Sequence, residues 1–136
     1  MRWLAIVSIL VLAGCETVVS PYDQTSFQQV TSCKAEALTL VEKATTPYSD
    51  NTEEIGSVSL DLLRAYEYDA GRKKNAFTLA QWDIVLNQNG DSFAGFLVLW
   101  KKRVSLPLAF VMAKRAQISV GFNQIIDAEF GKNREP

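Results

Sequence analysis

Apolar residues recur every three or four positions from about residue 25 onward, which is the spacing of one face of an amphipathic helix. Proline, glycine and small polar clusters divide this pattern into five segments. The first two cover residues 25–44 and 50–71. We predict a helix over each, with apolar faces made of Phe27, Val30, Cys33, Ala37, Val41 and Ala44 in the first and of Ile55, Val58, Leu62, Ala65, Tyr66 and Ala70 in the second.

The predicted helix ends carry recognisable signals. Residues 25–28 (Thr-Ser-Phe-Gln) and 78–81 (Thr-Leu-Ala-Gln) have the spacing of a capping box, in which a hydroxyl accepts a hydrogen bond from a backbone N–H three residues on. Residues 50–53 place acidic groups in a first turn, where the helix dipole favours them. Gly71 has the position of a C-cap.

The other three segments are less uniform in pattern. Residues 78–89 fit a helix that stops at Asn89-Gly90, although their middle also fits a strand. Residues 93–104 contain a continuous apolar run that fits a buried strand or a buried helix, and we predict a helix because no partner strand is evident. The last segment, residues 105–131, has Pro107 in its first turn and apolar residues around much of its circumference, which is typical of a central helix. The sequence therefore predicts a small all-α bundle of four to five helices.

The first fifteen residues have a different pattern. Residues 3–13 are almost wholly apolar, yet too short for a membrane span, which needs about 20 residues. They have the dimensions of the apolar part of a signal peptide. Leu12-Ala13-Gly14-Cys15 follows directly, and it resembles the lipobox of bacterial lipoproteins.

This resemblance implies the processing and the anchor. Residues 1–14 are expected to be removed by cleavage between Gly14 and Cys15, and Cys15 is expected to carry a covalent diacylglycerol and an N-acyl chain. Residues 15–24 are then the lipidated N-terminus and a tether, residues 25–131 the helical domain and residues 132–136 a polar tail. Nine extended residues of tether reach at most about 30 Å. Glu16 stands where an aspartate would retain a lipoprotein in the inner membrane, so the resemblance implies the periplasmic face of the outer membrane, with the inner membrane as the alternative.

The composition of the chain argues against several classes of function. The chain has no histidine, no glycine-rich phosphate loop and no cluster of metal ligands, so we expect neither an enzyme nor a metal or small-molecule cofactor. Its formal net charge is −1, without the concentrated basic face that nucleic acid needs. The carboxylates of Glu67 and Asp69 are interpreted as exposed groups near a helix end. Cys33 lies on an apolar stripe, which favours a core residue over a reactive or intermolecular thiol.

Two groups of residues are candidates for contact with a partner. Lys101, Lys102 and Arg103 follow the apolar run and fit either a solvated helix end or a basic patch for an acidic partner or lipid headgroups. The aromatic residues around them are interpreted mainly as core, with the alternative that some line a groove for an amphipathic helix or an extended peptide. This second group is Trp82, Phe93, Phe96 and Trp100.

The sequence leaves three functional hypotheses. The leading one is a membrane-anchored adaptor or assembly factor for a secretion, pilus or conjugation machine, with a protein partner in the cell envelope. In outline the chain is similar to pilot lipoproteins, although it lacks the paired domain cysteines found in some of them. The alternative is a protective or inhibitory lipoprotein, acting in immunity, in exclusion of phage or plasmid entry, or on a periplasmic enzyme. The third is an envelope hydrolase, which would need converging carboxylates such as Glu67 or Asp69.

Overall fold

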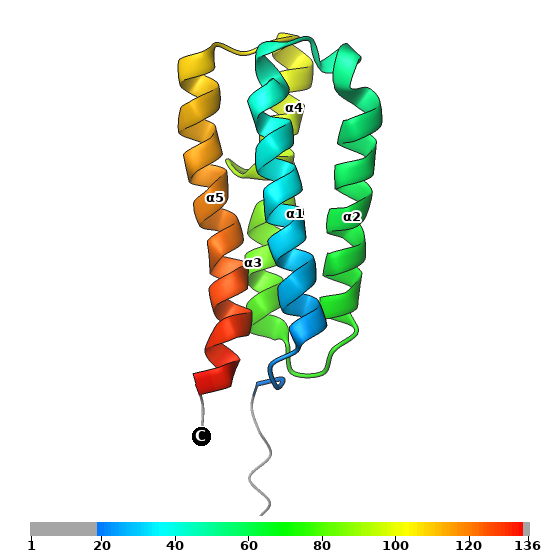
Figure 1. Cartoon of the computed structure of the whole chain (residues 1–136), viewed down its shortest axis with the longest axis vertical. Helices are drawn as coiled ribbons and strands as arrows, with labels where there is room; N and C mark the ends of the chain where they lie inside the picture. The colour runs from blue at the N-terminus through cyan, green and yellow to red at the C-terminus, as the bar shows by residue number, and fades with distance from the viewer. Residues whose placement is uncertain (1–18, 135–136) are drawn as a thin grey trace, which may run out of the picture.

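A computed structural model describes residues 19–134, in which five α-helices form a bundle (Figure 1). Short 3₁₀ turns lie between α1 and α2 and after α5, and the described residues contain no strand. The predicted all-α fold is therefore confirmed, including a helix in the run that also fitted a strand. The helices are α1 (Gln24–Glu42), α2 (Thr52–Ala70), α3 (Ala76–Leu86), α4 (Phe93–Arg103) and α5 (Leu108–Gly131), and the 3₁₀ turns are η1 (Lys43–Thr45), η2 (Tyr48–Asn51) and η3 (Lys132–Arg134).

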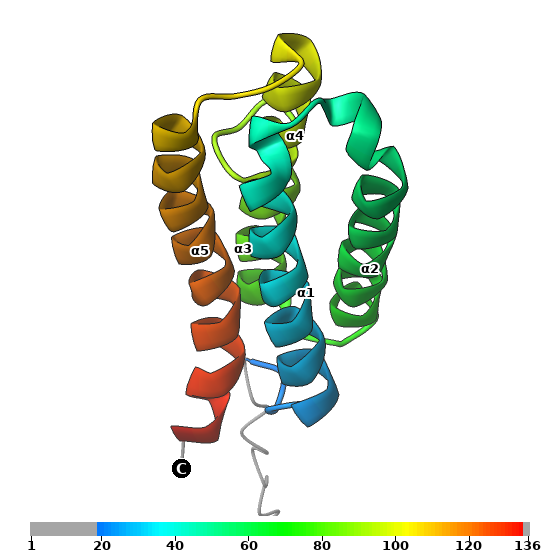
Figure 2. The ribbon, with the colours of Figure 1, turned by 45° about the horizontal axis from the view of Figure 1, so that its top comes forward.

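The bundle has four columns and two poles. α1 packs against α2 on one side and α5 on the other, and α5 also packs against α3. The shorter α3 and α4 follow each other along the remaining side, so together they make the fourth column (Figures 1 and 2). At the lower pole α1 and α3 begin and α2 and α5 end; at the upper pole α1 and α4 end and α2 and α5 begin.

The core forms where the apolar faces of all five helices meet. Phe122 of α5 is fully buried at its centre, and its ring meets the ring edges of Trp82 and Phe93 at centroid distances of 6.4 and 6.3 Å. Ile118 and Ile125 are buried on the same face of α5, as their spacing predicts. Other apolar residues of this helix were expected to make it central, but they lie at the surface: Leu108, Met112, Val120 and Phe130 are all more than two-fifths exposed. α5 is therefore a peripheral helix with one buried face.

Backbone hydrogen bonds close the upper pole. Tyr48 N donates to Val104 O at 2.9 Å, and Leu106 N donates to Ala44 O at 2.8 Å, which ties the α4–α5 connection to the α1–α2 connection. Trp100 Nε1 adds a bond to Thr46 O at 3.0 Å. Val104 has a φ of 71°, which is strained for a β-branched residue. These bonds from both sides hold it there.

Two predicted helix starts are wrong. α1 begins one residue before Thr25, because the Asp23 carboxylate caps it by accepting a hydrogen bond from Ser26 N at 2.9 Å. α3 begins at Ala76, and Thr78 is a buried residue inside it rather than its cap. The C-cap at Gly71 is confirmed, as are acidic residues in the first turn of α2.

Within residues 19–134, no helix combines the length and the apolar character needed to cross a lipid bilayer.

Candidate functional site

Charged side chains converge in the interior of the lower pole. Asp69 lies in the last turn of α2 and Glu129 in the last turn of α5, and both are buried. Arg72 and Lys132 follow these helices and are also largely buried, with side-chain exposures of 13% and 6%. The two acids and two bases balance in charge. We call these four residues, with Ser20 and Asn75, the polar cluster.

Glu129 is the acceptor at the middle of the polar cluster. Arg72 donates to it through both terminal nitrogens, from Nη1 to Oε2 at 2.9 Å and from Nη2 to Oε1 at 3.0 Å. Lys132 Nζ donates to Oε2 at 2.8 Å, and the backbone N–H of Asp23 donates to Oε1 at 2.7 Å. Such forked, charge-assisted pairing fixes the geometry as well as adding energy. Both carboxylate oxygens are therefore fully engaged.

Asp69 is engaged in the same way. Its Oδ2 accepts from Trp82 Nε1 at 2.7 Å, and its Oδ1 accepts from Ser26 Oγ at 2.5 Å and from Arg72 Nη1 at 3.1 Å. The prediction that Asp69 is exposed is wrong, because three donors from α1, α3 and the α2–α3 connection satisfy it inside the bundle. Glu67, its predicted companion, is exposed and does not join it.

The pairing outweighs the cost of burial for Glu129 and Arg72. Burial alone would raise the pKa of Glu129, but hydrogen bonds from Arg72, Lys132 and the Asp23 backbone hold it below its usual range. Burial alone would lower the pKa of Arg72, and its bonds and charge interactions with Glu129 and Asp69 raise it instead. Both residues are thus charged at neutral pH. Glu129, held in this way, lacks the free lone pairs and the raised pKa that a general acid or base requires.

The polar cluster also holds the segment that leads into α1. Ser20 is buried; its N–H donates to Lys74 O at 2.9 Å and its hydroxyl to Asn75 Oδ1 at 3.1 Å. Arg72 Nη2 donates to Pro21 O at 2.6 Å. The sequence placed residues 20–23 in a tether, but in the structure they pack against the bundle. The length of chain between Cys15 and the folded domain is correspondingly shorter.

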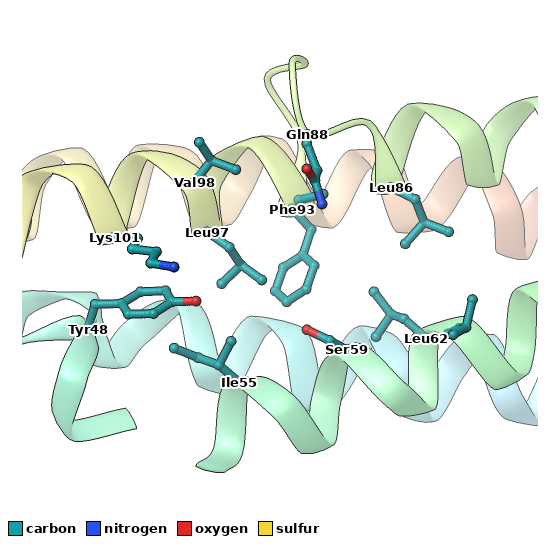
Figure 3. Close-up of a pocket in the computed structure, with 12 residues that line it drawn as sticks. Tyr48, Ile55, Ser59, Leu62, Leu86, Gln88, Phe93, Leu97, Val98 and Lys101 are labelled. Atoms are coloured by element: carbon teal, nitrogen blue, oxygen red, sulfur yellow. The ribbon is translucent and has the colours of Figure 1, made fainter. Parts of the chain in front are cut away.

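A second candidate site is a groove of about 540 Å³ between α2 and α4. α2 packs against α1 and α3 but makes few contacts with α4, which leaves a channel open to solvent near the upper pole. Figure 3 shows Ile55, Leu62, Phe93 and Leu97 extending into it from its two sides. The lining residues are Tyr48, Ile55, Ser59, Leu62, Leu63, Leu86, Gln88, Phe93, Ala94, Leu97, Val98 and Lys101.

The groove is lined mainly by apolar side chains, with the polar side chains of Tyr48, Ser59 and Gln88 among them, and it is charged at one end. Lys101 is the one charged residue among those that line it. Its Nζ lies 5.9 Å from the centroid of the Tyr48 ring, within the range of a cation–π contact. Leu63 and Val98 are each about half exposed at its rim. An apolar channel with one cation suits an amphipathic helix or an apolar chain whose acidic group lies at the Lys101 end.

The structure separates the predicted partner residues into two sets. Trp82, Phe96 and Trp100 are at most 2% exposed, so they belong to the core and offer no surface to a partner. Phe93 is also buried, although one part of its ring borders the groove. The cations behave differently: Lys101, Lys102 and Arg103 are exposed in the last turn of α4, where the helix dipole favours them.

The remaining expectations from the sequence are a core position for Cys33, the lack of a metal centre, and the lipidation site. Cys33 is 3% exposed, which confirms the core interpretation; burial, reinforced by the charges of Glu36 and Asp61, raises its pKa to about 12 and keeps the thiol protonated. Among the described residues, no group of His, Cys, Asp and Glu side chains is arranged to hold a metal ion. Gly14 and Cys15 lie outside the described residues.

Sequence reasoning missed Glu129, the residue to which both bases of the polar cluster donate. A signal was nevertheless present, since α2 and α5 end in related tetrapeptides, Asp69-Ala-Gly-Arg72 and Glu129-Phe-Gly-Lys132. Each places an acid in the last turn, where the helix dipole disfavours it, and a base three residues later that offsets the dipole. The repeat of this pattern indicates two helix ends that meet.

The first prediction concerns the stability that Glu129 supplies. Glu129→Gln leaves Arg72 and Lys132 without their shared counter-ion and should lower the free energy of unfolding by about 3 kcal/mol. Denaturant unfolding followed by tryptophan fluorescence measures this change. Asp61→Asn is the matched control because it removes an exposed ion pair with Arg64, and its effect should stay within about 0.5 kcal/mol. Equal effects of the two variants would show that the cluster is not a structural centre.

The second prediction concerns pH. Because folding lowers the pKa of Glu129 from 4.5, its contribution to stability is complete above that value and is lost as the pH falls through the lower, folded pKa. The difference in unfolding free energy between wild type and Glu129→Gln should therefore be constant above about pH 5 and shrink below pH 4.5. A difference that widens with acid would contradict the lowered pKa.

Comparison of the chain with protein-family models, with curated proteins and with solved structures gives no significant match.

Proposed function

We propose that the protein is a lipid-anchored adaptor that binds an amphipathic helix of a cell-envelope protein in the groove between α2 and α4. The observation that carries this proposal is the groove itself: a channel of about 540 Å³ on the surface of a small bundle, lined mainly by apolar side chains and with a single cation at one end. Exposed apolar side chains such as those at the rim of the groove are typical of a surface that a partner covers. The adaptor binds and positions this partner and performs no chemistry on it.

Two helices form the facing walls of the groove, an arrangement that suits the binding of one further helix. α4 presents Ala94, Leu97, Val98 and Lys101 to it, and α2 presents Ile55, Ser59, Leu62 and Leu63. Two roughly parallel walls of this kind accept a third helix through anchors spaced three and four residues apart. Lys101 then selects a partner helix that has an acidic side chain at the upper pole, or a partner helix whose C-terminal end lies there.

The lipobox supports the anchor and its place. With Cys15 lipidated and Glu16 behind it, the adaptor is held at the periplasmic face of the outer membrane. Confinement to a surface raises the effective concentration of the groove for partners in that membrane. A secretion, pilus or conjugation machine assembled there is the class of partner that such an adaptor serves.

The third prediction tests the groove by photocrosslinking in cells. A crosslinking amino acid at Val98, at the rim, should capture one dominant envelope protein, and the captured segment should be an amphipathic helix. The same probe at Val120 of α5, which is similarly exposed but outside the groove, should not capture it; the two valines are 48% and 56% exposed. Leu97→Glu, which places a charge inside the groove, should weaken the capture at position 98 roughly tenfold or more.

Two results would contradict the adaptor function. One is capture of the same mixture of proteins from positions 98 and 120, which would mean that the groove selects nothing. The other is capture at position 98 only after cells are exposed to phage, toxin or a conjugating donor. That second result would favour a protective lipoprotein, because its partner comes from outside the cell.

A further inference from the structure

Apolar side chains are exposed at the lower pole, where the described chain begins. Phe77, the second residue of α3, is 67% exposed, the largest value among the exposed large apolar residues of the described chain. Val19, the first described residue, is 36% exposed. Both line a hollow of about 490 Å³, together with Ala128 and Gly131 at the end of α5. The lower pole thus has an open apolar surface formed by parts of the chain far apart in sequence.

The sequence before Val19 determines what lies opposite this surface. Four residue steps separate Cys15 from Val19, a span of at most about 14 Å when fully extended. The polar cluster fixes the direction of approach, because Ser20 is buried against the bundle and bonded to the α2–α3 connection. A lipid on Cys15 therefore brings the bilayer within reach of Val19, and so of the hollow that it shares with Phe77.

The charges at this pole allow close approach to a lipid surface. Asp69 and Glu129, which would be repelled by anionic headgroups if exposed, are buried and paired with Arg72 and Lys132. In the exposed part, Lys73 and Lys74 lie in the α2–α3 connection, and the hollow has Lys74 and Asp127 in its wall. Asp127 offsets one of these two positive charges and the other suits anionic headgroups, so the charges do not oppose insertion of the apolar residues.

We propose that the lower pole is a membrane-docking surface, in which Phe77 and Val19 insert at the headgroup level of the bilayer that holds the lipid of Cys15. This inference rests on the proposed lipidation. It gives the anchored bundle one orientation: the lower pole of the bundle (Figure 1) sits on the membrane, and the groove between α2 and α4, lined by Tyr48 and Lys101 at one end, opens near the upper pole. α5 is about 36 Å long, so the Lys101 end of the groove stands roughly that far from the lipid surface.

The test measures contact with lipid at each pole, and it is the fourth prediction. Mature, lipidated protein that begins at Cys15 is reconstituted into vesicles of phosphatidylethanolamine and phosphatidylglycerol that contain phospholipid brominated near the headgroup, a contact quencher of tryptophan. The probe variant is Phe77→Trp. The matched control is Leu108→Trp, which is similarly exposed at 64% but begins α5 at the upper pole. The native Trp82 and Trp100 are fully buried and contribute a constant background.

Brominated lipid should lower the emission of the added tryptophan in Phe77→Trp roughly twofold and leave Leu108→Trp unchanged. Because the lipid anchor and the apolar side chains supply most of the attraction, the quenching should persist in high salt. Equal quenching in the two variants overturns the proposal, since the bundle then has no fixed orientation. No quenching in either variant, while the protein floats with the vesicles, also overturns it and leaves the lipidation intact.

A separate control isolates the lipid anchor. Cys15→Ser in the Phe77→Trp background should abolish both flotation and quenching, because one aromatic residue is too weak to hold the domain at a membrane. If the protein with native Cys15 carries no lipid mass and does not float, the proposed lipidation and the docking surface both fail. If it carries lipid but a photocrosslinker at position 77 in cells captures a single protein and no lipid, the lower pole is a protein interface and the docking proposal alone is overturned.

Discussion

The forked ion pair between Arg72 and Glu129 is the interaction on which the arrangement of the lower pole depends. It joins the end of α2 to the end of α5 across the segment that leads into α1. A lone carboxylate at this depth would be costly, and so would a lone guanidinium. The surrounding groups are therefore fixed in position by the hydrogen bonds that this pair requires. Lys132 and the backbone N–H of Asp23 donate the remaining hydrogen bonds to Glu129, and Asp69 accepts a further one from Arg72.

This constraint gives the two poles different characters. The lower pole is held by charge-assisted hydrogen bonds in a fixed geometry. The upper pole is closed by ordinary hydrogen bonds that involve Tyr48, Trp100 and Leu106, and α2 is left apart from α4 beside it. A rigid base and an open upper half suit a protein that is held at one end and receives a partner at the other.

Sequence periodicity predicted every helix, because burial of one face is a local property that repeats along the chain. Sequence reasoning failed where a tertiary contact determines the start of a helix or the burial of a side chain. Local signals placed helix starts at Thr25 and Thr78, whereas Asp23 caps α1 and the contacts of the polar cluster fix the chain before α3. Asp69 was predicted to be exposed because acids usually are, and the arginine and tryptophan that bury it act only once the helices pack.

The candidate sites also divide into those that a local sequence pattern indicates and those that depend on tertiary packing. The lipobox is a continuous motif, so the sequence alone indicates it. The groove results from the separation of α2 from α4, which no local pattern encodes, and so Lys101 was found among the candidates while Ile55 and Leu62 were assigned only to the core. The aromatic residues were the opposite case: Trp82 and Trp100 attract attention as binding residues, yet their size makes them the largest fully buried side chains of the described core.

Hydrogen exchange at the backbone amides of Ser20 and Asp23 tests most directly whether the polar cluster fixes the entry segment. Both amides should exchange at least about a hundredfold more slowly than in an unfolded chain, because their N–H groups donate to Lys74 and Glu129, and Glu129→Ala, which removes the acceptor, should remove the protection at Asp23. Unprotected exchange at both positions in the wild type would mean that the segment is a free tether. The bundle would then have no fixed relation to the lipid anchor that we propose at Cys15.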